Sequence, residues 1–471
     1  MARLLPLLLL LVCVPLAGVL AVAGPEHLKL VAGSLAGAVF LFLLVTRERL
    51  GLFLLVASFP FVNVVVLNLP GLALSVSDLT TIAFLTVHTV RVLIGKKQLR
   101  PIPYLGHLLI FIAICAIHIL VSTNKVNSIS FFMRFILIVA IFFILIGEID
   151  SIETVKKIMF SFFCGLLAMT VFNIAELRVL SSSVFHRVTA GSKNPNVFAD
   201  MLGATSLITV GLLSLTKRRS VKVLTFMIIG FLLFLLLNTY SRWGWIAFSC
   251  GLVYWMIVSR IDIRWISLIV IAVVLIVTVD DRILEIIGKR SWLVDKSSTN
   301  RFATYTYALR SILERPIVGI GFDQFTRLYE YIWVPRGAYQ RAPHNLYLKI
   351  GVEMGIFGLI AFLTYLARIA VGLLRGLLHA SLPAAERTVA VTASAILVQQ
   401  LVSQLSKSGM ASPLFWLSLA LAVGLTQQLA QVSGAPGWRR APALPPSAAP
   451  TPAPVAATES GTGGLVERYN G

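Results

Sequence analysis

Apolar runs of about 20 residues recur along this chain from one end to the other, and they constrain its fold more than any other feature. A helix of that length crosses the hydrocarbon core of a bilayer, which is about 30 Å thick. Hydrophobic residues make up 58% of the chain and charged residues only 13%, against about 25% charged in soluble domains. The sequence therefore predicts an all-α polytopic membrane protein. It excludes an ordinary cytosolic enzyme, a disordered chain and a disulfide scaffold.

Counting these runs predicts about 12–14 transmembrane helices. The third run is the weakest, because Pro60 interrupts it and Pro70 ends it. The first run precedes Ala21-Val22-Ala23, which has the pattern of a signal-peptide cleavage site. Its apolar stretch is longer than the usual signal sequence, so we interpret it as a span. The predicted spans are 4–23, 28–46, 51–69, 78–95, 104–122, 132–147, 157–176, 197–215, 222–238, 243–259, 264–279, 346–370, 388–405 and 411–430.

Lys and Arg concentrate in alternate turns between the spans, as at Arg91 to Arg100 and Lys217 to Lys222. Such turns face the cytoplasm, so the N-terminus is predicted to be cytoplasmic. The net charge of +20 is spread over these turns instead of forming one patch, and no nucleic acid partner is expected. The predicted organisation is a transmembrane bundle over 1–279, an outer loop over 280–343, further spans over 344–432 and a disordered cytoplasmic tail over 433–471.

The outer loop is long enough to be a functional element. Ser298-Thr299 and the residues up to Arg315 indicate a capped helix with one apolar face. Pro316 is predicted to end this helix, and Gly319-Ile320-Gly321 to form a sharp turn. The helix would either lie on the membrane surface or cover the bundle.

Three outer segments each place a predicted helix N-terminus beside a basic residue: Asn194-Pro195, Ser241-Arg242 and Pro343-His344-Asn345. Helix N-termini carry partial positive charge, so an Arg there opposes helix stability unless an anion joins the two. Phosphate or pyrophosphate fits, because Arg binds it in a fork and helix N–H groups add donors. The alternative for Arg242 is that it extends to the lipid headgroups.

His344 is the sharpest single candidate. We expect it in the first turn of its span, where the helix dipole and nearby Arg lower its pKa and keep the imidazole neutral. A neutral imidazole can act as a general base toward a hydroxyl. The alternative is a capping histidine, which is how we interpret the other six, with His186 a weaker second candidate. Outer carboxylates are scattered and no Asp-x-Asp pair occurs, so neither a metal nor another cofactor is expected.

Two charged residues fall inside predicted spans. Arg134, near the outer end of its span, either joins the anion site or extends to the interface. Glu353 lies nine residues after His344, about 13 Å along the helix axis, and is predicted to hold a partner helix.

These outer segments resemble the O-antigen ligase and O-antigen polymerase superfamily of bacterial membranes. The resemblance covers roughly residues 185–370 and keeps the motifs in order. The residues that carry it are Asn194-Pro195-Asn196, Thr239-Tyr240-Ser241-Arg242, Arg301 with Arg310, Pro316 to Gly321, and His344-Asn345-Leu346-Tyr347-Leu348 running to Glu353-Met354-Gly355.

The resemblance implies a GT-C-like glycosyltransferase of the bacterial inner membrane with a periplasmic active site. The implied donor is a glycan on undecaprenyl diphosphate, and the acceptor of a ligase is a sugar hydroxyl of the lipid A core. Transfer is implied to invert the anomeric centre without metal, with His344 and Arg242 as the catalytic residues. Pyrophosphate contacts are implied for Arg242, for Arg301 or Arg310, and for Arg187, Asn194 and Asn345.

The ligase is the first hypothesis for function. A polymerase and a protein O-oligosaccharyltransferase use the same donor and remain open. The non-enzyme alternative is a lipid-glycan flippase, which would be expected to bury charges along a central path. Here the candidate residues gather at one face beside a large outer loop, which favours an enzyme.

Overall fold

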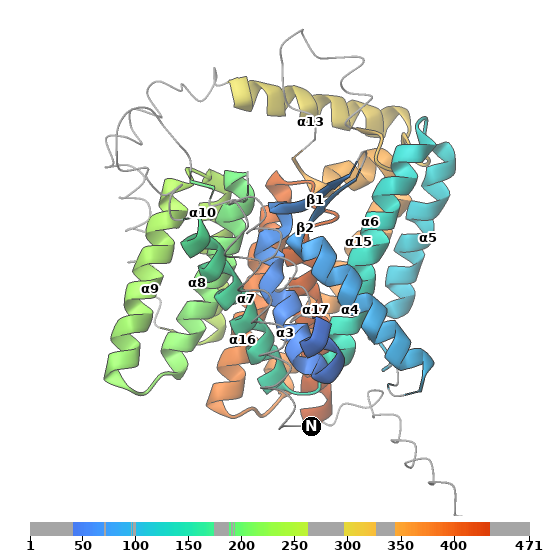
Figure 1. Ribbon diagram of the computed structural model, residues 1–471. Coiled ribbons are helices and arrows are strands. Elements are labelled where there is room, and N and C mark those ends of the chain that lie inside the picture. Colours follow the sequence, from blue (N-terminus) through green and yellow to red (C-terminus); the bar gives the residue numbers. More distant parts are fainter. Residues whose placement is uncertain are drawn as a thin grey trace, which may run out of the picture.

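The computed structural model describes residues 41–69, 72–95, 97, 100–173, 188–189, 192, 194–261, 296–325 and 344–433. Helices dominate this part of the chain (Figure 1), and eight of them are long and apolar enough to cross a membrane. The all-α polytopic membrane fold is therefore confirmed. The eight are α4 (Val76–Leu93), α6 (Lys125–Glu148), α7 (Ile152–Phe172), α8 (Pro195–Leu215), α9 (Arg219–Asn238), α15 (Leu346–His379), α16 (Ala384–Ser403) and α17 (Pro413–Val432).

Two further helices of 17 residues, α5 (Leu105–Val121) and α10 (Arg242–Val258), occupy the predicted spans 104–122 and 243–259. The predicted spans 4–23 and 264–279, most of 28–46, and the tail after residue 433 lie outside the described residues.

The predicted span 51–69 is wrong. A short helix, α3 (Glu48–Ser58), is followed by a 3-10 turn, η1 (Phe59–Asn63), that contains Pro60. The chain then forms strand β1 (Val65–Leu69), which pairs antiparallel with β2 (Leu72–Ser75). Proline lacks the amide hydrogen and restricts the preceding residue, so the helix stops before it reaches the length of a span. The apolar residues of 51–69 therefore belong partly to a short helix and partly to a β-hairpin.

The helices that frame the candidate site begin at one end of the bundle. The starts of α8 and α17 and the residue His344 before α15 line one cavity, and Ser241 before α10 hydrogen-bonds to Asn196 of α8. Helix α13 (Lys296–Glu314) lies across this end (Figure 1) and packs on α15 through Ala308 and Val352. We call it the α13 end. The predicted loop helix is thus present and covers the bundle.

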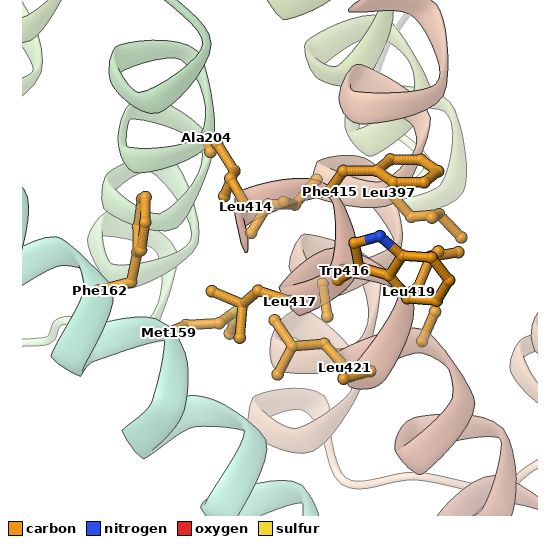
Figure 2. Close-up of a cluster of buried hydrophobic side chains, with 14 of the residues drawn as sticks. Met159, Phe162, Ala204, Leu397, Leu414, Phe415, Trp416, Leu417, Leu419 and Leu421 are labelled. Atoms are coloured by element: carbon orange, nitrogen blue, oxygen red, sulfur yellow. The ribbon is translucent and has the colours of Figure 1, made fainter. Parts of the chain in front are cut away.

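Helix α17 forms the centre of the packing. Figure 2 shows Met159 and Phe162 of α7 facing Leu414 and Leu417 of α17. On another side, Trp416 makes edge contacts with Phe142 of α6, at 5.2 Å between ring centroids. Burial of aromatic side chains on several helices at once fixes the position of α17 within the bundle.

A loop after α13 is held against a break in α15. The amides of Ile320 and Gly321 donate to the carbonyls of Val352 and Glu353, each at 3.0 Å. The Glu353 carboxylate accepts from the amides of Asp323 at 3.0 Å and Phe325 at 3.3 Å. The prediction that Glu353 holds a partner helix is therefore wrong, because it holds a loop. The predicted turn is confirmed, with φ of +63° at Gly319 and +99° at Gly321.

Gly355 allows this docking, because its φ is +65° and a Cβ there would lie 2.2 Å from the carbonyl oxygen of Ile317. We expect Gly355→Ala to lower the free energy of unfolding by at least about 1–2 kcal/mol, the usual cost of a left-handed backbone with a side chain. Thermal unfolding in detergent measures it. Gly230→Ala is the control, since nothing lies within 4 Å of that position. Equal melting temperatures for the two variants would contradict the role of Gly355.

Candidate functional site

His344 lies just before α15. The helix begins at Leu346, and Asn345 caps it by accepting a hydrogen bond from the Leu348 amide at 3.0 Å. His344 is half-buried with a φ of +44°. It therefore precedes the cap, whereas the sequence predicted it in the first helical turn behind Pro343.

A cavity of about 250 Å³ opens beside His344 at the α13 end, and we call it the His344 cavity. Its wall comes from η1, α7, the start of α8 and the turn between α16 and α17. Polar and apolar residues both line the cavity. Its polar lining residues are Asn194, Asn196, Asp200, His344, Gln404, Ser406, Lys407, Ser408 and Ser412.

A largely buried ion pair is part of the lining of this cavity. Lys407 pairs with Asp200 and donates to the carbonyl of Asn196, and Ser403 donates to the other Asp200 oxygen at 2.6 Å. The exposed fractions of the Lys407 and Asp200 side chains are 15% and 9%. Burial lowers the pKa of Lys407, and the Asp200 carboxylate offsets part of that shift. The cavity that His344 lines therefore also contains the Lys407 ammonium group, whose charge is balanced by the Asp200 carboxylate.

Sequence reasoning missed this pair. In the sequence, Asp200 is one of several scattered carboxylates, and no motif marks Lys407. The available signal is a lysine between Ser406 and Ser408 in the turn before the last predicted span. Nothing in the sequence alone places that turn against the start of α8, which lies about 200 residues earlier.

Arg242 is the first residue of α10 and is half-buried. Helix α9 ends at Asn238, so only Thr239, Tyr240 and Ser241 separate the two helices. Ser241 caps α10 and donates to Asn196 Oδ1 at 2.8 Å. Arg242 itself does not line the His344 cavity, but the residue before it bonds to one that does. His344 and Arg242 therefore lie at the same end of the bundle.

The two asparagines act as helix caps. Asn194 accepts from the Asn196 amide at 2.9 Å with Pro195 as the first helical residue, which confirms the predicted cap. Asn194 lines the cavity and Asn345 does not. Arg187 lies outside the described residues. The next residue, Val188, donates to the carbonyl of Asn238 at 3.2 Å and so meets the end of α9.

Of the two candidate arginines of α13, the structure describes the side chain of Arg310 but not that of Arg301. Arg310 Nε contacts Glu314 Oε1 at 2.7 Å, and 64% of the Arg310 side chain is exposed. It does not line the His344 cavity. Residue 301 lies in the first turns of α13, but its side chain is outside the described part.

A second, larger cavity of about 450 Å³ adjoins the first, and we call it the Arg134 cavity. Phe59, Val62 and Pro413 line both cavities and form the wall between them. Arg134 is exposed and lines this second cavity, not the His344 cavity, so both predictions for it stay open.

Within the described residues, the group that could hold a metal ion lies at the opposite end. It consists of Glu48, His88 and Glu148. Lys97 Nζ contacts both carboxylates, and Arg91 contacts Glu48 at 2.6 Å. These cations already compensate the carboxylates, and the group is remote from His344.

The fold and the site define a polytopic membrane protein with a polar cavity at one end of its bundle. Residues 227–363 match the family model described as O-antigen ligase. The predicted superfamily is thus confirmed: this region belongs to the O-antigen ligase and polymerase superfamily, whose members are glycosyltransferase-like enzymes. The match includes Arg242, Arg301, Arg310 and His344. No curated protein sequence matches the chain significantly.

Breaking the ion pair at one partner should destabilise the protein. Lys407→Met leaves the Asp200 carboxylate buried without a counter-charge, and we expect a loss of about 3 kcal/mol of unfolding free energy. The double variant Asp200→Asn, Lys407→Met removes both charges and should recover most of the loss. Melting temperatures of both variants in detergent test this. A double variant no more stable than Lys407→Met would contradict the coupling.

Proposed function

We propose that this protein is an O-antigen ligase of the bacterial inner membrane. It transfers a polysaccharide from undecaprenyl diphosphate to a sugar hydroxyl of the lipid A core at the periplasmic face. The observation that carries the proposal is the His344 cavity, where a histidine of the family-matched region meets a helix start and a partly buried cation from outside that region.

The proposed reaction is a single displacement. The acceptor hydroxyl oxygen attacks the anomeric carbon, the bond from that carbon to the diphosphate oxygen breaks, and the configuration inverts. His344 accepts the hydroxyl proton as the general base. Diphosphate leaves with its charge stabilised by Arg242 and by helix N–H groups, so no metal is required.

Helix register supports Arg301 over Arg310 as the loop arginine. Position 301 lies three, seven and ten residues before Thr304, Ala308 and Ser311, which are all buried. Residues at these spacings share one face of a helix. Arg310 instead belongs to an exposed pair with Glu314. Arg187, Asn194 and Asn345 complete the proposed pyrophosphate contacts. The capping oxygens of the asparagines are engaged, so their amide nitrogens would be the donors.

A polymerase and a protein O-oligosaccharyltransferase would use the same donor and the same residues, and the product distinguishes them. A flippase is less consistent with the described residues, where the polar lining of the His344 cavity is confined to the α13 end. A translocation path would carry polar groups through the full depth of the bundle.

We expect His344→Ala and Arg242→Ala each to lower the transfer rate by about 10²–10³, the usual cost of one lost group that stabilises the transition state. Purified variants are assayed with lipid-linked glycan and lipid A core. His379→Ala is the matched control, because His379 ends α15 at the opposite end and bonds to the Arg375 carbonyl. Normal glycan attachment in cells carrying His344→Ala would refute the base assignment.

Removing divalent cations should leave the rate unchanged, because guanidinium groups and helix N–H groups are proposed to meet the diphosphate charge. The rate is measured in the same assay with and without EDTA. Loss of activity that Mg²⁺ restores would refute the metal-independent mechanism. Modification of the lipid A core identifies a ligase, whereas extension of the donor glycan identifies a polymerase.

A further inference from the structure

The first part of α15 is a separate helical segment. It begins after the cap Asn345 and ends before the break at Gly355, so a left-handed residue joins Leu346–Met354 to the rest of the helix. We call Leu346–Met354 the first α15 segment. The long span that follows does not fix its direction, so contacts at its sides must do so. Because His344 directly precedes the cap, these contacts also determine where the proposed base lies.

One face of the first α15 segment carries two buried charged side chains, Lys349 and Glu353. They lie four and eight residues after Asn345, which is the spacing of residues on one helix face. The Lys349 amide donates to the Asn345 carbonyl at 3.0 Å. The exposed fractions of the Lys349 and Glu353 side chains are 7% and 1%. Charges buried to this extent require partners that compensate them.

The partners of Lys349 come from the loop after α13, from α15 itself and from α6. Its Nζ donates to Asp323 Oδ1 at 2.9 Å and lies 3.8 Å from Glu353 Oε1. It also lies 4.7 Å from the centre of the Phe131 ring, which is a cation–π contact. Lys349 lines neither of the two cavities described above. Its charge can therefore act on His344 only through the position of the backbone.

Asp323 is a fixed point, because the residues on both sides of it are bonded to the start of α6. The Phe322 carbonyl accepts from the Ser128 hydroxyl at 2.6 Å, and Gln324 Nε2 donates to the same hydroxyl oxygen at 2.8 Å. The φ of Asp323 is +55°, a left-handed conformation that Asp and Asn adopt more readily than most residues. The ion pair of Lys349 with Asp323 thus ties the first α15 segment to α6 and to the loop after α13.

We propose that Lys349 is a positioning residue for glycan transfer: its ion pair with Asp323 holds the first α15 segment so that His344 lies at its cavity. The assignment rests on the function proposed above and adds a residue to that site. The loop that contains Asp323 follows α13, the helix of the proposed loop arginine, Arg301. The same ion pair therefore sets how the proposed base lies relative to that helix. Its loss would leave the substrate contacts in place and slow the step in which the acceptor hydroxyl loses its proton.

The transfer rate at saturating substrate separates positioning from folding. We expect Lys349→Met to lower kcat about tenfold to a hundredfold, and to change the KM of either substrate by less than about threefold, because no substrate contact is lost. Lys97→Met is the matched control, since Lys97 also bridges two carboxylates, Glu48 and Glu148, but at the opposite end. It should lower the melting temperature similarly and leave the kcat of the folded protein within about twofold.

Two further variants separate the ion pair from the stability it confers. Asp323→Asn keeps an oxygen that accepts from Lys349 and suits the left-handed backbone, so we expect kcat within about threefold of the wild type. The double variant Lys349→Met, Asp323→Asn has no unpaired Asp323 carboxylate, so the melting temperature should recover in part while kcat stays low. Recovery of kcat together with the melting temperature would assign Lys349 a purely structural role and overturn the proposal.

A measurement without glycan transfer tests the position of His344 directly. Purified full-length protein in detergent reacts with diethyl pyrocarbonate, and mass spectrometry locates the modified histidines. We expect Lys349→Met to change the modification rate of His344 several-fold, whereas His379, exposed at the opposite end, should react at the wild-type rate. An unchanged rate at His344 would overturn the positioning role, whether or not the protein transfers glycan.

Failure of this inference and failure of the proposed function give different results. Wild-type kcat in Lys349→Met would refute the positioning role and leave the function. A wild-type protein that transfers no glycan, but whose His344 modification rate depends on Lys349, would refute the proposed function and leave the positioning role.

Discussion

Polar groups inside a bilayer must pair with one another, because no water is present to hydrogen-bond them. The arrangement of this protein follows from that constraint. Asp200, Lys407 and Ser403 satisfy one another between α8 and the turn after α16. Glu353 is satisfied by backbone amides of the loop after α13. Each buried charge therefore holds a neighbouring segment in place at the α13 end: Asp200 holds the turn after α16, and Glu353 holds the loop after α13. The contacts that compensate the buried charges also position the residues around the candidate site.

Helix starts and the break in α15 then determine where the functional groups lie. Asn194, Ser241 and Asn345 each end a loop by capping a helix, and the Ser241 hydroxyl links two of these starts through Asn196. Gly355 interrupts α15 so that the loop after α13 can pack against its backbone. Rigid helix ends thus position His344 and Arg242 at one end of the bundle, although the two residues are far apart in the chain.

Local patterns predicted the fold well wherever one segment determined its own structure. Apolar length located most of the described spans, and Asn-Pro and Gly-Ile-Gly located a cap and a turn. The prediction of a span over 51–69 is wrong because hydrophobicity alone does not distinguish one long helix from a short helix followed by a hairpin. Pro60 is the residue in the sequence that marks the difference. His344 and Arg242 could be proposed from their positions at helix starts. The Asp200–Lys407 pair and the wall between the two cavities could not, because they depend on contacts between η1, α8, α17 and the turn before α17 that no local pattern encodes.

The family match ends within α15, at residue 363. Most of the polar residues that line the His344 cavity instead come from α8 and from the turn that leads into α17. A shortened protein limited to residues 227–363 would keep the His344 imidazole but lose the residues of α8 and of the turn before α17 that line the cavity with it. Evolution or engineering could accordingly alter what the cavity accepts by changing α8 and the turn before α17, while the segment that bears the proposed base stays untouched.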